Sequence, residues 1–197
     1  YWVSYPDMVL LADGKPVFLD CPEGDAFKMR PDALEKVINS RTKWLILNSP
    51  SNPTGAAYSV EEMRGLASVL MKYPDVWILT DDIYEHVLYD EFEFKTLAEI
   101  EPRLSDRILL LNGMSKAYSM TGWRLGYAAA PANLIKAMNN VQSQSTTHAS
   151  SISQAAGVEA LNGTQDFIVP NNELFKTRRD LVVSMLNEAE GINCLTP

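Results

Sequence analysis

The chain has 197 residues, which is enough for one large domain or two small ones. Hydrophobic residues make up 46% and charged residues 21%, a balance that is typical of folded globular proteins and excludes a disordered chain. The longest apolar runs, such as Ile108–Leu111, are far shorter than the roughly 20 residues that cross a bilayer. We therefore expect no membrane span.

The charge balance also limits the partners. There are 17 Lys and Arg against 25 Asp and Glu, giving a net charge of −8 that disfavours binding to nucleic-acid phosphates. Cys21 and Cys194 lie far apart, and with two histidines in the chain they offer no metal-ligand spacing. The sequence predicts no metal site and no nucleic-acid partner, and the two thiols favour a reducing, cytoplasmic location.

Short apolar runs mark the candidate strands. They are Val17–Leu19, Trp44–Leu47, Val76–Leu79, Ile108–Leu111 and Gly126–Ala129. The second, third and fourth are nearly continuous apolar runs, as expected for strands of a parallel sheet that are buried on both faces.

Helical patterns separate these runs. Ser59–Glu62 has the form of a capping box, and Met63, Leu66 and Leu70 then recur at helical spacing. Other helices are predicted at Pro31–Ile38, Pro131–Val141, Ser150–Leu161 and about Asn172–Ala189. The alternation predicts an α/β fold with three layers, a mostly parallel sheet flanked by helices.

Polar residues follow three of the predicted strands. Asn48–Gly55 follows the Trp44 run, Asp81–Tyr84 follows the Val76 run, and Asn112–Lys116 follows the Ile108 run. Ligands of such sheets bind beyond the carboxyl ends of the strands. We therefore expect an amide, a carboxylate with a phenol, and an amine to gather at one edge of the sheet.

Four spaced motifs together resemble the class I and II aminotransferases, which are pyridoxal-5′-phosphate (PLP) enzymes of fold type I. The motifs are Asn52–Gly55, Asp81–Tyr84, Ser115–Lys116 followed by Thr121–Tyr127, and Tyr1–Pro6. The last is similar to a segment of the bacterial aspartate aminotransferases. The resemblance runs along the whole chain in matching order and implies the large, cofactor-binding domain of fold type I.

The resemblance implies a role for each motif residue. Lys116 resembles the Schiff-base lysine, whose neutral amine attacks the cofactor aldehyde and later moves the substrate Cα proton. Asp81 resembles the carboxylate that pairs with the pyridine nitrogen. Its neighbour Asp82 is the rival, and Asp81 is preferred because Tyr84 lies three residues on and would share its face in a helical turn.

The remaining roles concern the cofactor's other groups. Asn52 and Tyr84 would hydrogen-bond its phenolic oxygen, Arg124 would grip its phosphate, and Trp2 would stack on its ring. Trp2 and Asn52 are also expected to contact the substrate. Plain structural roles, a turn for Asn52 and core packing for Trp2, are the alternatives. One departure is Gly113, where many relatives carry a phosphate-binding Ser.

The implied activity is transfer of an amino group between an amino acid and a 2-oxo acid such as 2-oxoglutarate, in a cytoplasmic homodimer. Aspartate is the preferred substrate, with prephenate, aromatic and branched-chain amino acids still open. Two other classes stay open: a PLP-dependent lyase or synthase of the same fold, and a non-catalytic PLP-binding regulatory domain.

The resemblance also implies a central fragment of a longer protein. Residues 1–170 are expected to belong to a large domain that is incomplete at its N-terminus, and residues 171–197 to form a helix that leads toward an absent small domain. A Gly-rich phosphate-binding turn and a carboxylate-binding arginine would lie outside the chain. We therefore expect this piece alone to be inactive.

Overall fold

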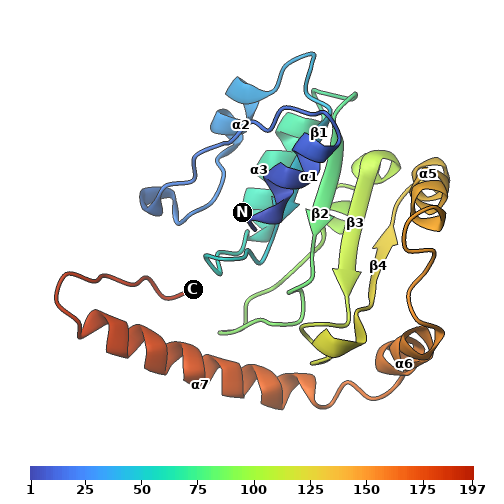
Figure 1. Cartoon of the computed structure of the whole chain (residues 1–197). Coiled ribbons are helices and arrows are strands. Elements are labelled where there is room, and N and C mark those ends of the chain that lie inside the picture. The colour runs from blue at the N-terminus through green and yellow to red at the C-terminus, as the bar shows by residue number, and fades with distance from the viewer.

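Four strands form one sheet at the centre of the molecule, in a computed structural model that describes residues Tyr1–Pro197 (Figure 1). The sheet order follows the chain order: β1 (Trp44–Asn48), β2 (Trp77–Asp81), β3 (Ile108–Gly113) and β4 (Gly126–Ala129). The first three strands are parallel, and β4 runs antiparallel to β3. Four of the five predicted strands are thus confirmed.

The predicted strand Val17–Leu19 is wrong. These residues pair with no other strand, and the side chains of Val17 and Phe18 are exposed. The ring of Phe18 stacks on that of Tyr1, with the centroids 5.3 Å apart. A three-residue apolar run favours a strand only where a neighbouring strand completes its hydrogen bonds, and no strand of this sheet does so.

Seven α-helices surround the sheet. They are α1 (Ser4–Leu11), α2 (Pro31–Val37), α3 (Val60–Leu70), α4 (Leu97–Ile100), α5 (Ala132–Ser143), α6 (Ser151–Asn162) and α7 (Ile168–Asn187). Short 3₁₀ helices occur at Glu23–Asp25, Pro102–Arg107 and Thr121–Trp123. All five predicted helices are confirmed, with shifted ends. The short helices α1 and α4 are additions, and α1 begins without a side-chain cap that could have marked it.

Helix α3 begins with the expected capping box. At the start of α3, Ser59 Oγ accepts from the Glu62 N–H at 3.2 Å, and a Glu62 carboxylate oxygen accepts from the Ser59 N–H at 2.7 Å. Helix α7 begins at Ile168, so the domain boundary expected at residue 170 falls inside its first turn. Pro170 is tolerated there because first-turn N–H groups have no partner within the helix.

The core lies on one face of the sheet, under α2, α3 and α4. Its most buried members are Leu34, Leu66, Leu70, Ile78, Leu97 and Leu104. Along β2, Ile78 and Thr80 are buried against these helices, while Leu79 and Asp81 point to the other face and are only partly buried. On that other face, Tyr5 of α1 reaches Asp81. The predicted α/β fold, a mostly parallel sheet flanked by helices, is confirmed.

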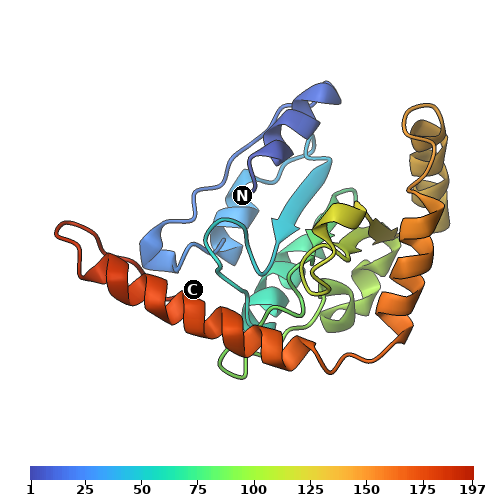
Figure 2. The ribbon, with the colours of Figure 1, turned by 60° about the horizontal axis from the view of Figure 1, so that its bottom comes forward.

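The C-terminal helices extend away from this core. In Figures 1 and 2, α7 runs along one side of the molecule, and the segment after it turns back toward the middle. Its end reaches the turn after β1, because a Cβ added at Gly55 would lie 2.4 Å from the Pro197 side chain. Arg179 of α7 holds this segment through a 3.1 Å hydrogen bond from Nη1 to the Pro197 carbonyl.

The molecule exposes more surface than a compact chain of its size. Its accessible area is 12572 Å², against about 9300 Å² for a typical monomer of this mass. Exposed apolar side chains gather on α1 and on the C-terminal helices, among them Met8, Leu10, Leu11, Ile152, Val158, Leu181, Val182 and Met185. Patches of this kind mark surfaces that other protein covers. None of the helices has the length and apolar character needed to cross a membrane.

Arg107 fastens the end of α3 to the start of β2. Its guanidinium donates to the carbonyls of Leu70 at 2.7 Å, Tyr73 at 3.1 Å and Val76, and burial lowers its pKa. Because Arg107→Met leaves these carbonyls without their charged donor, we expect the free energy of unfolding to fall by about 2–3 kcal/mol. Urea unfolding followed by circular dichroism measures this loss.

Arg103 provides the matched control. It pairs with Glu101 at 2.7 Å, but its side chain is 72% exposed. Exposed ion pairs contribute at most about 1 kcal/mol. Arg103→Met should therefore change stability little, and equal losses in the two variants would contradict the fastening role of Arg107.

Candidate active site

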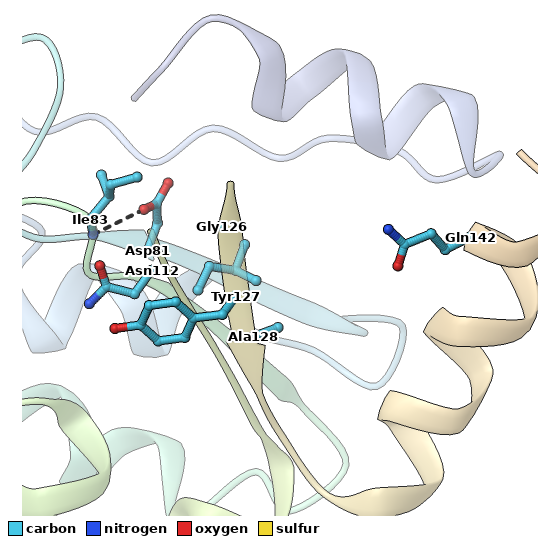
Figure 3. A pocket seen from close by; sticks show the side chains of 8 residues that line it. Asp81, Ile83, Asn112, Gly126, Tyr127, Ala128 and Gln142 are labelled. Atoms are coloured by element: carbon cyan, nitrogen blue, oxygen red, sulfur yellow. Dashed lines mark hydrogen bonds between the residues drawn. The ribbon is translucent and has the colours of Figure 1, made fainter. Parts of the chain in front are cut away.

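Asp81 ends β2 and has both carboxylate oxygens engaged. Oδ2 accepts a 2.6 Å hydrogen bond from the Tyr5 phenol, and Oδ1 accepts a 3.3 Å bond from the Ile83 N–H, which Figure 3 marks with a dashed line. Tyr5 is only 8% exposed, and burial, followed by the bond to Asp81, raises its pKa above the ordinary value. The phenol therefore stays a donor and fixes the orientation of the carboxylate.

Asp82, the rival carboxylate, points to the opposite face. It is 3% exposed and lies against the helix-covered core, where Thr80 Oγ1 donates to it at a long 3.5 Å. Burial, with smaller contributions from the charges of Glu85 and Asp81, raises its pKa to about 7. This position favours Asp81 over Asp82 as the group available to a ligand.

Lys116 and Tyr84 come together from neighbouring strand ends. Tyr84 lies three residues beyond β2 and Lys116 three residues beyond β3, and these strands are paired in parallel. The Lys116 ammonium lies 5.7 Å from the centroid of the Tyr84 ring, within the range of a cation–π contact. The amine is exposed at this edge of the sheet and is accessible to a ligand.

Trp2 and Asn52 connect to Asp81 through two intermediaries. The Trp2 ring meets the Tyr5 ring edge-on at 5.8 Å, and Tyr5 donates to Asp81. Asn48 accepts from the Asn52 N–H at 2.8 Å and donates to the Asp81 carbonyl at 2.8 Å. Three of the predicted residues therefore belong to one connected group.

Neither intermediary was singled out from the sequence. Tyr5 lies within the Tyr1–Pro6 motif, but nothing in that motif marks it as a partner of Asp81. Asn48 had a clearer signal, since it is the amide that ends a buried strand. The contacts themselves span 76 residues for Tyr5 and 33 for Asn48, which no local pattern encodes.

Arg124 makes no hydrogen bond or ion pair with the other five predicted residues. It lies two residues before β4, at the end of the 3₁₀ helix Thr121–Trp123, in a left-handed conformation with φ 51°. Its exposed guanidinium donates to the Thr121 carbonyl at 2.9 Å. The departure at Gly113 has a packing cause. Gly113 faces Gly126 across the ladder, and a Cβ there would approach Gly126 Cα and the Leu125 carbonyl to 3.1 Å.

A cavity of about 410 Å³ opens at the carboxyl ends of β2 and β3, a size suited to a small molecule. Its lining consists of Asp81, Ile83, Leu111, Asn112, Gly126, Tyr127, Ala128 and Gln142. Figure 3 shows Gln142 of α5 across the opening from Asp81. Asp81 alone among the predicted cofactor residues lines this cavity.

The chemistry of this set fits the groups of PLP. An amine suits an aldehyde, a carboxylate suits a ring nitrogen, an amide and a phenol suit a phenolic oxygen, and an arginine suits a phosphate. The phosphate end has the fewest donors, because Gly113 brings no hydroxyl.

The family follows from comparison with known proteins. Residues 1–197 match the family model described as aminotransferase class I and II. The chain belongs to this family. Its members are PLP-dependent enzymes, so the expected cofactor is the one that this family of aminotransferases uses.

Close relatives of this chain are about twice as long. The aspartate/prephenate aminotransferase of Cereibacter sphaeroides is 59% identical over 197 residues, which are 100% of this chain and 49% of that protein. The aspartate aminotransferase of Rhizobium meliloti is 54% identical over 100% of this chain and 48% of its own length. The chain thus spans about half the length of the curated relatives it matches.

Solved structures agree with the fold. The crystal structure of the Rhizobium meliloti aspartate aminotransferase has a TM-score of 0.98 at 54% identity, covering 100% of this chain and 49% of that one. The Thermus thermophilus aspartate aminotransferase with maleate has a TM-score of 0.89 at 40% identity, covering 95% and 49%. The expected fold type I is confirmed.

The position of Asp82 predicts a pH dependence of stability. Its pKa is about 7 in the folded chain against an ordinary 3.8. Between these values the folded state holds a proton that the unfolded state has lost, so stability falls as the pH rises from 4 to 7. The slope is at most about 1.4 kcal/mol per pH unit. Urea unfolding at pH 5, 6, 7 and 8 measures it, and Asp82→Asn should flatten the curve.

Between pH 5 and 7 the titration of Asp82 can be told apart from the titration of the paired surface carboxylates. Hydrogen bonds from Arg30 to Asp32 and from Arg103 to Glu101 lower the pKa of each carboxyl to about 2. Their contributions to stability are lost only as the pH falls below about 4. Parallel curves for the chain and Asp82→Asn between pH 5 and 7 would contradict the assignment.

Proposed function

We propose that the protein containing this chain is a PLP-dependent aminotransferase that moves an amino group between aspartate and a 2-oxo acid such as 2-oxoglutarate. The observation that carries the proposal is the meeting of Lys116, Tyr84 and Asp81 at the ends of two paired strands. The relatives named aspartate aminotransferase support it. When bound, PLP supplies a ring that accepts electron density from the substrate Cα.

Lys116 would act at both ends of the reaction. Its Nζ, as the neutral amine, would hold the cofactor through the aldehyde group. The same nitrogen would be placed to take the proton from the substrate Cα and later to give it back. Its place in the turn after β3, beside Tyr84, suits both steps, because the amine is accessible and held near the strand ends.

The other residues would hold the cofactor in place. Asp81, fixed by its two donors, would accept a hydrogen bond from the ring nitrogen and favour its protonated form. Asn52 and Tyr84 would donate to the phenolic oxygen, and Arg124 would bind the phosphate through its fork of donors. Trp2 would cover the ring and, with Asn52, contact the substrate.

Prephenate is a second candidate substrate. A 59% identical relative carries both aspartate and prephenate in its name. Product analysis separates these uses and the two other classes. Oxaloacetate formed from aspartate and 2-oxoglutarate supports transamination, a cleavage or condensation product supports a lyase or synthase, and cofactor binding without turnover supports a regulatory domain.

We also infer the domain organisation, the oligomeric state and the cellular location of the proposed enzyme. Residues 1–170 would belong to the cofactor-binding domain, and residues 171–197 would lead toward a second domain. The large exposed apolar surface on α6 and α7 supports assembly into a homodimer, in which a second copy covers part of it. The free thiols of Cys21 and Cys194 support a cytoplasmic location.

Cofactor attachment tests the role of Lys116. When the full-length protein is supplied with PLP and reduced with borohydride, peptide mass spectrometry should find the cofactor on Lys116. Lys116→Ala should remove both the adduct and the oxaloacetate formed from aspartate and 2-oxoglutarate. Lys95→Ala is the control, because Lys95 is an exposed partner of Glu93 at 3.5 Å. An adduct on another lysine would move the site.

Phosphate binding tests Arg124. Arg124→Ala in the full-length protein should raise the dissociation constant of PLP about tenfold or more, because a charge-assisted hydrogen bond is lost. Excess PLP should then restore part of the activity. Arg124→Lys should recover only part of the affinity, since a lysine lacks the bidentate fork.

An exposed arginine of α7 controls for the general loss of charge. Arg178 stacks over the Phe175 ring at 5.8 Å and has no place in the proposed site. Arg178→Ala should leave the PLP affinity unchanged, measured by titrating the cofactor-free protein. Unchanged affinity in Arg124→Ala would place the phosphate elsewhere.

A further inference from the structure

One side chain connects two of the proposed cofactor contacts. Asn48 Oδ1 accepts from the Asn52 N–H, and Asn48 Nδ2 donates to the Asp81 carbonyl, each at 2.8 Å. We propose that Asn48 is a positioning residue that holds Asn52 and Asp81 as one unit. The proposal rests on the proposed function, since it assigns Asn48 a task in the same cofactor site.

The position of Asn48 follows from the sheet. It is the last residue of β1 and lies opposite Asp81, the last residue of β2, in the parallel register. Two residues on, Pro50 carries no N–H with which to continue the ladder. The Nδ2 group of Asn48 supplies a donor to β2 where the backbone of β1 turns away, so Asp81 is held at its carbonyl as well as at its carboxylate.

The second bond fixes the turn that follows β1. The Asn52 N–H points back at Asn48 Oδ1 and closes a loop of four residues. A primary amide is the neutral side chain that presents an acceptor and donors on one rigid plane, and asparagine is its short form. Both partners are part-buried main-chain groups. Loss of either bond leaves a polar group without its protein partner.

Asn48 therefore acts through its neighbours. Its two bonds go to the main chains of Asn52 and Asp81, so the side chains of both remain available to a ligand. A shift of either residue alone would break one of the bonds. The expected effect of losing Asn48 is poorer alignment of two cofactor contacts together.

Asn48→Asp in the full-length holoenzyme is the sharpest test. It keeps the size and the acceptor for Asn52, and it replaces the donor with an oxygen that faces the Asp81 carbonyl. The dissociation constant of PLP should rise about tenfold, the size expected for a lost hydrogen bond of a part-buried group. The pH midpoint of the visible absorbance of the lysine-bound cofactor should move upward, because displaced donors stabilise the phenolate less.

Asn39→Asp is the matched control. Asn39 makes the same pair of bonds, from Nδ2 to the Val37 carbonyl at 3.2 Å and from the Arg41 N–H to Oδ1 at 3.0 Å. It lies in the turn before β1, outside the proposed site. Asn39→Asp should leave both the PLP affinity and the absorbance midpoint unchanged, even if it alters stability.

The coupling between contacts gives a second readout. If Asn48 acts through Asn52, then Asn52→Ala should weaken PLP binding less in the Asn48→Ala background than in the wild type. Should Asn48→Asp not fold, Asn48→Ser takes its place in the same titrations. Unchanged affinity and midpoint in a folded Asn48 variant, or strictly additive effects, would overturn the proposal. A wild-type protein that binds no PLP would instead refute the proposed function.

Discussion

The packing of α2, α3 and α4 on one face of the sheet is the constraint on which the rest of the structure depends. Ile78 is fully buried against these helices, and the alternation of β2 then sends Thr80 the same way and Asp81 the opposite way. A slip of one residue would exchange the two faces. The choice between Asp81 and Asp82 at the site is thus made by the hydrophobic core.

The parallel strand register fixes which residues of β1 and β3 lie beside Asp81. The parallel register sets Asn48 opposite Asp81, and Asp81 opposite Leu111 on β3. Three segments of the chain therefore leave the sheet at the carboxyl ends of β1, β2 and β3, and their polar residues lie at the same edge. Tyr5 and Asn48 then tie separate segments to the same aspartate. The candidate site is a consequence of strand register followed by a few specific hydrogen bonds.

The parts of this arrangement that local sequence encodes could be predicted. The capping box at Ser59 and the near-continuous apolar runs of β1 to β3 marked elements that the structure contains. The Val17–Leu19 run failed because a strand depends on a neighbour, which three residues do not specify. Helix α1 went unseen because its apolar residues cover no single face and it has no side-chain cap.

The sequence predicted which types of residue make up the candidate site, but not the hydrogen bonds that join them. The order of the motifs along the chain was enough to predict that an amide, a carboxylate, a phenol and an amine would share an edge. The bond of Tyr5 to Asp81 depends on how α1 is placed against the sheet, and a helix that could not be predicted could not be placed. The same holds for the place of Arg124, whose neighbour Leu125 packs against Gly157 of α6, a helix distant in the sequence.

The adjacent residues Asp81 and Asp82 point to opposite faces of the sheet and meet different surroundings. Asp81 receives a short bond from a buried phenol and another from a backbone N–H, whereas Asp82 has one long bond to a hydroxyl inside the core. Burial raises the pKa of Asp82 to about 7, so near neutral pH its carboxyl is partly protonated and the repulsion between the neighbours is reduced. The two carboxylates are neighbours in the sequence, but one accepts two hydrogen bonds on the open face of the sheet and the other lies in the core. This difference in environment gives the two acids different charge states. Because Asp82 lies on the core face of the sheet and is partly protonated there, it adds little negative charge beside Asp81, the residue that would contact the cofactor.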